Sequence, residues 1–210
     1  MSDNDRKQQR LIVLSGPSGC GKATLLKYVT DHTDIKRVIT YTTRKPRPGE
    51  VDGRDYHFVS KAGFDRMYRD GELIEAEQVY GDFFYGSPKD IFSGASSDVI
   101  MELDTKGTEN YRRFYSDIVT IFILPPSIDE LVRRIKTRHP EANFKQRLQA
   151  AHEQLESAQL YDFIVVNDEV ERVGPELLDI IEHGSQHESR DQKLQLAAAL
   201  SEAVSQKYTA

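Results

Sequence analysis

Residues 16–22 constrain the fold more than any other stretch of the chain. Their sequence, GPSGCGK, has the spacing of the phosphate-binding loop: a glycine, four residues, a glycine and a lysine. The loop follows the apolar run 11–14 and precedes residues 24–29, which begin an amphipathic helix. Glycines let successive N–H groups turn toward phosphate oxygens, and the positive end of the helix dipole adds to the attraction. The sequence therefore predicts a strand, a nucleotide phosphate loop and a helix, with Lys22 reaching the outer phosphates.

Position 23 departs from this pattern. The residue after the lysine is normally Ser or Thr, whose hydroxyl binds Mg²⁺, and here it is Ala23. Alanine cannot coordinate a metal, but Mg²⁺ readily keeps several water ligands. We therefore expect nucleotide phosphate binding to persist while the metal is held less firmly.

Composition limits the class of protein. A chain of 210 residues, 38% hydrophobic and 30% charged, suits one large soluble domain. No apolar run approaches the ~20 residues of a membrane span, and the N-terminus has no secretory signal. The single cysteine, Cys20, excludes an internal disulfide framework and is interpreted as a small neutral filler of the loop. The net charge of -6 argues against general nucleic-acid binding. We expect a cytoplasmic protein with no membrane or nucleic-acid partner.

Apolar strands alternate with helices along most of the chain. Strands are expected at residues 11–14, 99–104, 118–124 and 163–166. Ser127 with Glu130 predicts a capping box for the helix that follows the third of these. This alternation predicts an α/β fold with a doubly wound parallel sheet, whose ligands bind at the carboxyl ends of the strands. The phosphate loop, Asp104 and Asn167 each follow a strand, so they should share that edge.

Residues 40–96 interrupt the alternation with short, mixed elements, which predicts an inserted lobe. We expect a β-rich segment at 38–43, a short strand at 55–59, a helix at 60–70 capped by Ser60, and a strand at 73–79. Ser87 followed by Pro88 is typical of a helix start.

Two basic clusters stand out in this acidic chain. Arg44, Lys45 and Arg47 lie in a proline-rich loop, which is either a solvated loop or an anion clamp. The second cluster spans residues 130–147 and consists of Arg133, Arg134, Lys136, Arg138, Lys145 and Arg147. A charged helix face is the common interpretation of such a cluster. Because Pro140 interrupts the helix, we favour a helix–turn–helix flap that closes over a triphosphate and excludes water.

The composition changes at residue 184. A linker leads to apolar residues at helical spacing: Leu194, Leu196, Ala197, Leu200, Ala203 and Val204. They predict a helix that either packs on the body of the protein or joins two copies of the chain. No motif lies there, so we expect removal of residues 184–210 to leave catalysis nearly unchanged.

In chain order, several segments together resemble the guanylate kinase family from about residue 10 to 183. They are GPSGCGK, TYTTRKPRPGEVDGRDYHFVS, IEAEQVYGDFFYGS, IMELDTKG, FILPPS, the arginine flap and VVND. The resemblance implies a three-layer P-loop kinase fold with a central parallel sheet, an inserted mixed α/β GMP-binding lobe and a helical lid. It assigns residues 10–39, 97–129 and 152–183 to the core, 40–96 to the GMP-binding lobe, 130–151 to the lid, and 184–210 to a C-terminal linker and helix. The implied reaction moves the γ-phosphate of ATP to GMP, and to dGMP, with Mg²⁺.

The resemblance also assigns roles to individual residues. The ATP-binding residues it implies are Gly16, Pro17, Ser18, Gly19, Cys20, Gly21, Lys22, Ala23, Thr24, Asn167 and Asp168. The GMP-binding residues it implies are Thr40, Arg44, Arg47, Glu50, Tyr56, Glu75, Tyr85, Ser87 and Asp104. The catalytic residues it implies are Lys22, Arg44, Arg134, Arg138 and Arg147, with Glu102 and Asp104 holding Mg²⁺ through water. Glu75 would accept guanine's N1–H and 2-amino groups, whereas adenine presents an acceptor at N1. Unpaired buried polar groups of this kind discriminate by about 10⁴.

The chain departs from the family pattern at several positions. Besides Ala23, it has Lys106 in place of glutamine in D-x-Q-G, one extra residue in 81–86, and Tyr41 where a small residue or histidine is usual. Ala23 keeps open a guanylate kinase-like binding module that no longer catalyses, although Lys22 and the flap arginines argue against it. A related P-loop kinase for another acceptor is the other alternative, against which Glu75 and Thr40 argue.

Overall fold

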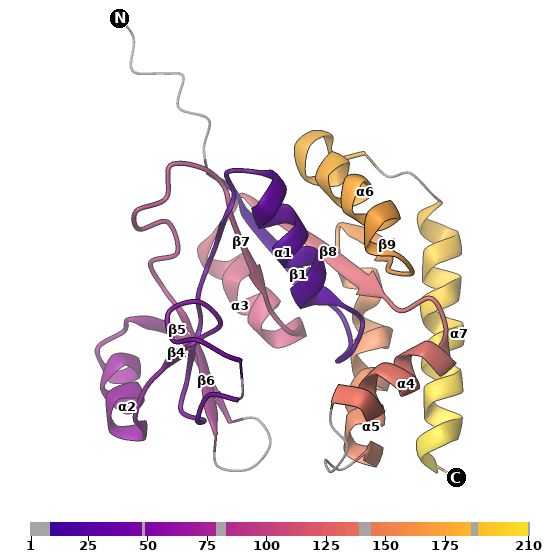
Figure 1. The fold of residues 1–210 in the computed structure, drawn as a ribbon, viewed down its shortest axis with the longest axis horizontal. Coiled ribbons are helices and arrows are strands. Elements are labelled where there is room, and N and C mark those ends of the chain that lie inside the picture. Colours follow the sequence, from indigo (N-terminus) through magenta and orange to yellow (C-terminus); the bar gives the residue numbers. More distant parts are fainter. Residues whose placement is uncertain (1–8, 48, 79–82, 139–143, 186–188, 210) are drawn as a thin grey trace, which may run out of the picture.

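Five parallel strands form the central sheet of the computed structural model (Figure 1). The structure describes residues 9–47, 49–78, 83–138, 144–185 and 189–209. In spatial order the strands are β2 (Lys36–Arg37), β7 (Val99–Glu102), β1 (Leu11–Ser15), β8 (Ile118–Leu124) and β9 (Phe163–Val166). The central strand, β1, pairs in parallel with β7 on one side and β8 on the other, and all of its residues are buried. The predicted parallel sheet is confirmed, and its apolar strands reflect burial on both faces.

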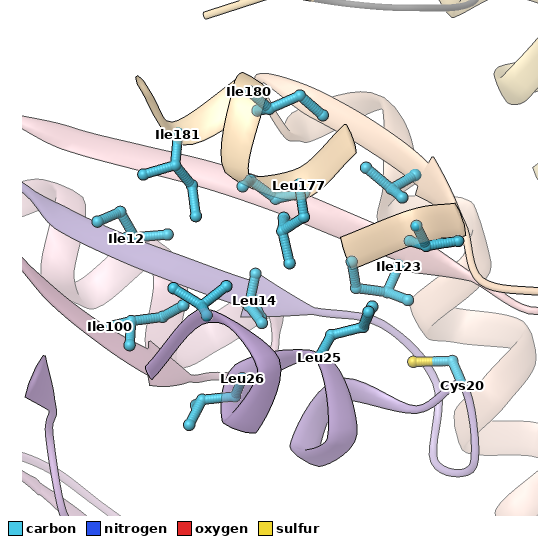
Figure 2. Packing of buried hydrophobic residues seen from close by; sticks show 14 residues of the cluster. Ile12, Leu14, Cys20, Leu25, Leu26, Ile100, Ile123, Leu177, Ile180 and Ile181 are labelled. Atoms are coloured by element: carbon cyan, nitrogen blue, oxygen red, sulfur yellow. The ribbon is translucent and has the colours of Figure 1, made fainter. Parts of the chain in front are cut away.

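Helices α1 (Lys22–His32) and α6 (Val170–His183) cover one face of the sheet. Figure 2 shows this layer, in which Ile12, Leu14 and Ile123 of the sheet meet Leu25 of α1 and Leu177 of α6. All five side chains are fully buried. The first turn of α1 is therefore packed against the sheet at the point where the phosphate loop leaves β1.

The opposite face carries two groups of helices. Helix α3 (Thr105–Phe114) covers β1 and β7 through Tyr111. The β8 and β9 end is covered by α4 (Ile128–Arg138), α5 (Phe144–Glu156), the short 3-10 helix η1 (Ser157–Leu160) and α7 (Arg190–Thr209). Helix α7 lies along the edge of the molecule beside α4 and α5 (Figure 1), and its Leu200 is buried with Phe122 and Leu148. The helix predicted at the C-terminus thus packs on the body of the protein.

A second, four-stranded sheet forms the inserted lobe. Its order is β4 (His57–Phe58), β3 (Tyr41–Thr42), β6 (Phe84–Pro88) and β5 (Leu73–Gln78). Helix α2 (Lys61–Arg69) packs on this sheet, and Ser60 caps it by accepting a hydrogen bond from the Gly63 N–H at 3.1 Å. The predicted cap and helix are confirmed, and the lobe lies beside the core sheet in Figure 1.

Two local predictions in the lobe were wrong. The β-rich segment 38–43 is divided, because Val38 still donates to Ile100 of the core sheet while β3 belongs to the lobe sheet. Ser87 and Pro88 do not start a helix and instead end strand β6. The residues of β6 that pair with β3 are Tyr85 and Gly86. Pro88 lies beyond them, so its missing N–H costs that ladder no hydrogen bond.

The flap is described on both of its arms. Pro140, with residues 139–143, lies outside the described residues. The capping box is half confirmed, because Ser127 Oγ accepts from the Glu130 N–H at 3.2 Å. The Glu130 carboxylate instead binds Arg133 and Arg134. Within the described part of the chain, no helix is both long and apolar enough to cross a membrane.

Candidate active site

The phosphate loop joins β1 to α1 and is packed tightly on two neighbours. Gly16 has a φ of 137°, and a Cβ there would lie 2.3 Å from the carbonyl oxygen of Ile123. Gly21 has a φ of 98°, and its Cβ would lie 2.1 Å from Nδ2 of Asn167. These positions need glycine both for the left-handed backbone and for the close approach of strand ends β8 and β9. The predicted shared edge is thereby confirmed, since Asn167 Nδ2 also donates to the Cys20 carbonyl at 2.7 Å.

Lys22 folds back over this loop. Its Nζ donates to the carbonyl oxygens of Gly16 at 2.5 Å and Pro17 at 3.2 Å. Cys20 is fully buried, and burial raises the pKa of its thiol. A neutral buried thiol is a poor nucleophile, which agrees with its interpretation as a filler. Ala23 and Thr24 are exposed at the start of α1.

A cavity of about 700 Å³ opens in front of the loop. The loop, the lobe, α3 and α5 all contribute to its walls. The residues that line it are Ser18, Gly19, Gly21, Lys22, Arg47, Tyr56, Tyr85, Glu102, Asp104, Thr105, Lys106, Arg147, Ala150, Glu153, Gln154 and Ser157. The structure therefore brings residues from both predicted substrate sites to one space. Lys106, which the sequence marked only as a departure from the family pattern, adds a further positive charge to that space.

A second cavity, of about 200 Å³, adjoins the first and reaches into the lobe. It is lined by Thr40, Tyr56, Glu75, Tyr85, Gly86, Ser87, Glu102, Leu103 and Asp104. Tyr56, Tyr85, Glu102 and Asp104 line both cavities, so the two form one continuous site. A flat molecule with a charged tail would place its ring in the smaller cavity and its tail toward the loop.

Glu75 provides the polar group of the smaller cavity. Its Oε1 accepts from Ser87 Oγ at 3.0 Å, and its Oε2 accepts from Asn110 Nδ2 at 3.1 Å. Burial raises the pKa of Glu75 and nearby Asp104 adds to the shift, while the two hydrogen bonds oppose it. A Cβ on Gly107 would lie 2.9 Å from Oε1, so glycine gives the carboxylate its space.

Sequence reasoning missed Asn110. The signal that could have found it is its spacing, because Gly107 and Asn110 lie three residues apart on α3 and so share one face. Asp104, three residues before Gly107, caps this helix by accepting from the Gly107 N–H at 2.8 Å. The first turns of α3 therefore provide both the space and one hydrogen-bond donor for the Glu75 carboxylate.

The Arg44 side chain is held by Glu50. Its Nη1 and Nη2 donate to the two carboxylate oxygens of Glu50 at 2.6 and 2.7 Å, and its Nε donates to the hydroxyl of Tyr85 at 3.1 Å. The hydrogen bonds from Arg44 lower the pKa of Glu50 to about 2. Arg44 is 7% exposed and its guanidinium stacks 5.1 Å from the ring centroid of Tyr56. Glu50 thus faces Arg44 and is not among the residues lining either cavity.

Two tyrosines carry the wall between Arg44 and the large cavity. The rings of Tyr56 and Tyr85 meet edge to face, with centroids 5.9 Å apart. Burial raises the pKa of Tyr56, so its hydroxyl stays protonated and can donate. Because Tyr85 accepts from Arg44, its own hydroxyl proton is directed elsewhere. With Arg47, these hydroxyls place hydrogen-bond donors and a positive charge on one wall of the cavity.

The flap arginines occupy different positions. Arg147 lines the large cavity, whereas Arg134 lies beside the loop and is held by Glu130 at 2.6 Å. Arg134 also reaches the carbonyl of Asn167 at 3.5 Å. The side chain of Arg138 lies outside what the structure describes. Asp168 does not line either cavity and is bound by Arg172 at 2.9 Å.

Comparisons with known proteins match most of the chain. A family model described as guanylate kinase matches residues 8–184 and so ends before α7. A guanylate kinase of Caldanaerobacter subterraneus subsp. tengcongensis is 40% identical over 182 residues, which cover 84% of this chain and 88% of that protein. One of Clostridioides difficile is 39% identical and covers 83% and 88%. The crystal structure of guanylate kinase from Anaplasma phagocytophilum is similar with a TM-score of 0.67 at 29% identity, over 86% of this chain and 88% of that chain.

Proposed function

The chain belongs to the guanylate kinase family and transfers phosphate from ATP to GMP, and from that premise we propose which of its residues hold each substrate. The observation that carries the proposal is the pair of joined cavities, with a buried carboxylate in the smaller one and the phosphate loop at the mouth of the larger one. GMP takes the smaller cavity and extends its phosphate into the larger one. ATP brings its triphosphate to the loop from the opposite side.

Glu75 reads the base in this proposal. Guanine presents two donors on one edge, N1–H and the 2-amino group, and a carboxylate accepts both. Ser87 and Asn110 already orient the two carboxylate oxygens, so little rearrangement is needed when guanine enters. Thr40 and Asp104 complete the walls around the ring. Adenine would turn its N1 acceptor toward Glu75 and leave buried polar groups unpaired.

The GMP phosphate contacts Arg47 and the hydroxyls of Tyr56 and Tyr85. Arg44 contributes positive charge behind these groups, and its bond to Tyr85 sets the direction of the tyrosine hydroxyl. Glu50 holds Arg44 in place, since both of its carboxylate oxygens are engaged by the guanidinium. Glu50 is therefore proposed as a positioning residue of the GMP site and not as a direct ligand.

The ATP phosphates are bound by the loop N–H groups from Gly16 to Thr24, with Lys22 at the outer phosphates. Lys22 exchanges the loop carbonyls that it now contacts for phosphate oxygens, which are stronger acceptors. Arg147 faces the same space from α5, and Arg134 lies beside the loop on α4, the helix whose sequence also includes Arg138. Asn167 and Asp168 lie on the adenine side of the loop.

We propose that Mg²⁺ is bound beside the ATP phosphates by Glu102 and Asp104 through water. The described residues contain no cluster of three or more His, Cys, Asp or Glu that would hold a metal alone. The carboxylates of Glu102 and Asp104 with water suit Mg²⁺, which is usually bound by one or two carboxylates, waters and substrate phosphates. When bound, the ion neutralises charge on the β- and γ-phosphates. Ala23 leaves the ion one protein ligand short of the usual loop.

No residue of the chain needs to act as a nucleophile. The GMP phosphate oxygen attacks the γ-phosphorus in line, and the bond to the β–γ bridging oxygen breaks. The residues contribute alignment of the two phosphates and neutralisation of charge on the transferring group. Closure of the flap over the site keeps water from the γ-phosphate. Because both substrates are cytoplasmic metabolites and the only cysteine is buried, we propose a cytoplasmic location.

The test is a coupled assay of ADP release with GMP, dGMP, AMP, CMP and UMP, for the parent and for Glu75→Gln. We expect GMP and dGMP to be the substrates. Glu75→Gln removes one charge-assisted bond and presents an amide donor to guanine's donors. The loss of transition-state stabilisation derived from kcat/KM for GMP should be about 2–4 kcal/mol, with little change in KM for ATP. Equal turnover of GMP by both proteins would show that Glu75 does not read the base. ATP and GMP binding without turnover would favour a binding module.

A further inference from the structure

Helix α7 buries a charged residue that the proposed reaction does not use. Lys193 is 2% exposed, and its Nζ lies 2.9 Å from Oε1 of Glu176 on α6, which is 8% exposed. Burying an ion pair costs desolvation energy, and an apolar pair of similar volume is often as stable. A buried pair is therefore weak evidence for stability, and its value lies in fixing how the neighbouring groups are placed.

The pair continues to the surface of α6 and then to the loop after β9. Nη1 of Arg172 lies 3.3 Å from Oε2 of Glu176, and its Nε lies 2.9 Å from Oδ1 of Asp168. Nη2 of Arg172 donates to the carbonyl of Val166 at 2.9 Å. Lys193, Glu176, Arg172 and Asp168 thus form one charge chain, of alternating sign, from α7 to the strand end.

Asn167, the neighbour of Asp168 at the far end of this charge chain, is in contact with the phosphate loop. Asn167 is 3% exposed and lies between Val166 and Asp168. Its N–H donates to the Leu124 carbonyl at 2.8 Å, and its Nδ2 donates to the Cys20 carbonyl at 2.7 Å. The segment 166–168 is therefore fixed by the phosphate loop on one side and by Arg172 on the other.

We infer that Lys193 is a positioning residue for ATP, acting through Glu176 and Arg172 on the segment 166–168. The inference rests on the proposed placement of adenine beside Asn167 and Asp168. Without Lys193, the buried Glu176 carboxylate keeps Arg172 as an ion-pair partner and draws the guanidinium toward itself. The bonds from Arg172 to Asp168 and to the Val166 carbonyl then weaken, and the adenine side of the site loses its fixed shape.

The test is Lys193→Met, which removes the charge and keeps the length of the side chain. Calorimetry would measure the Kd of ATP, of inorganic tripolyphosphate, which has no adenine, and of GMP. We expect ATP binding to weaken by about 3- to 30-fold, the range reported for mutations along such networks, while tripolyphosphate and GMP bind as in the parent. KM for ATP rises accordingly, with KM for GMP unchanged. Lys207→Met is the matched control, because Lys207 is on the same helix in an exposed ion pair with Asp129.

Two further variants keep the inference testable if Lys193→Met does not fold. Arg172→Gln breaks the same charge chain at a side chain that is 44% exposed, and it should weaken ATP but not tripolyphosphate. Lys193→Met combined with Glu176→Gln leaves no unpaired buried charge, so Arg172 stays on Asp168 and ATP affinity should return to within about 3-fold of the parent.

Three results would overturn the inference. They are unchanged ATP affinity in Arg172→Gln, equal weakening of ATP, tripolyphosphate and GMP in Lys193→Met, and no recovery in the double variant. Asp168→Ala separates this failure from failure of the proposed adenine site. If Asp168→Ala weakens ATP relative to tripolyphosphate and Lys193→Met does not, the adenine site stands and the role of Lys193 falls. If neither variant does so, the placement of adenine is wrong.

Discussion

At the scale of single residues, the smaller cavity, which is the proposed base pocket, is defined by one carboxylate and its two donors. Glu75 is held by Ser87 from the neighbouring strand and by Asn110 from α3. Each donor fixes one oxygen, and the remaining lone pairs are left for a ligand. The position of Glu75 therefore depends on two elements distant in sequence from it.

Replacing Asn110 tests this arrangement. We expect Asn110→Leu to raise the Kd of GMP by about 10- to 150-fold, since a hydrogen bond to a charged group contributes about 1.5–3 kcal/mol. The Kd of ATP should not change. Glu109→Ala, at the adjacent exposed position, is the control and should bind both nucleotides like the parent. A parental GMP affinity in Asn110→Leu would contradict a role in orienting Glu75.

The raised pKa of Glu75 predicts a pH dependence of GMP binding. Burial lifts this pKa above its ordinary value of 4.5, so the carboxylate is fully present above the raised pKa and is lost as the pH falls through it. GMP affinity should therefore begin to fall at a higher pH than an exposed glutamate would cause. The phosphate of GMP also titrates, near pH 6, so the measurement is the difference between the parent and Glu75→Gln over pH 4–8. Superimposed profiles of the two proteins would exclude Glu75 as the titrating group.

Ala23 predicts a kinase that needs more Mg²⁺. Restoring the hydroxyl with Ala23→Ser should lower the free Mg²⁺ concentration required for half-maximal rate by about 10–100-fold. This magnitude is taken from the effect of removing groups that support metal ligands in other sites. The measurement is initial rate against free Mg²⁺ at saturating ATP and GMP. GMP binding without metal should be the same in both proteins. Identical Mg²⁺ curves would mean that the hydroxyl is irrelevant in this chain.

Residues of the phosphate loop could be predicted from sequence because their spacing is local. Gly16 and Gly21 have the positive φ and close packing that such a loop requires, and Lys22 folds back over it. Asn110 and the bond between Glu50 and Arg44 could not be placed in the same way. Their roles depend on which strand faces which helix, and no local pattern carries that information.

At the scale of elements, α7 is part of the core and not an appendage. Its Ala197, Leu200 and Val204 are buried against α5 and β9. The apolar spacing predicted the helix, and the absence of a motif predicted that its removal would leave catalysis nearly unchanged. Removal of residues 184–210 would expose the apolar face of α5 and would also remove Lys193, so we expect the deletion to reduce stability and to weaken ATP binding.

A single substitution measures this contribution. Leu200 is 4% exposed, and Leu200→Ala should reduce the free energy of unfolding by about 2–5 kcal/mol. Leu160→Ala is the matched control, because Leu160 is 53% exposed and its replacement should change stability by less than about 0.5 kcal/mol. Urea denaturation monitored by circular dichroism compares the two. Equal stability of both variants would show that α7 does not contribute to the core.

The elements that sequence placed wrongly are short and lie where the chain passes between sheets. The segment 38–43 has strand-forming residues throughout, yet Val38 bonds to the core sheet while Tyr41 and Thr42 pair with the lobe sheet. Ser87 followed by Pro88 is a pair typical of a helix start, but both residues lie in strand β6. Residue preferences identify extended chain at such positions but do not identify its partner, which tertiary contacts decide.

At the scale of the whole molecule, the site lies where the core sheet, the lobe and the flap meet. The loop and α3 belong to the core sheet, the base pocket belongs mainly to the lobe, and Arg147 comes from α5. The parallel sheet that the sequence predicted brings the first two together. The positions of the lobe and the flap relative to this edge could not be predicted from the sequence, because they depend on contacts between parts that are distant in sequence.

The pairing of Arg44 with Glu50 affects how readily free anions can bind to Arg44. Cells contain free phosphate, sulfate and carboxylate metabolites, and an open arginine fork would attract all of them. In this lobe the fork is already filled by a carboxylate of the chain itself. A stray anion must compete with that internal partner, whereas GMP also gains its base contacts in the adjoining pocket. On the proposed placement of GMP, the Arg44–Glu50 pair therefore favours the nucleotide over a simple anion at Arg44.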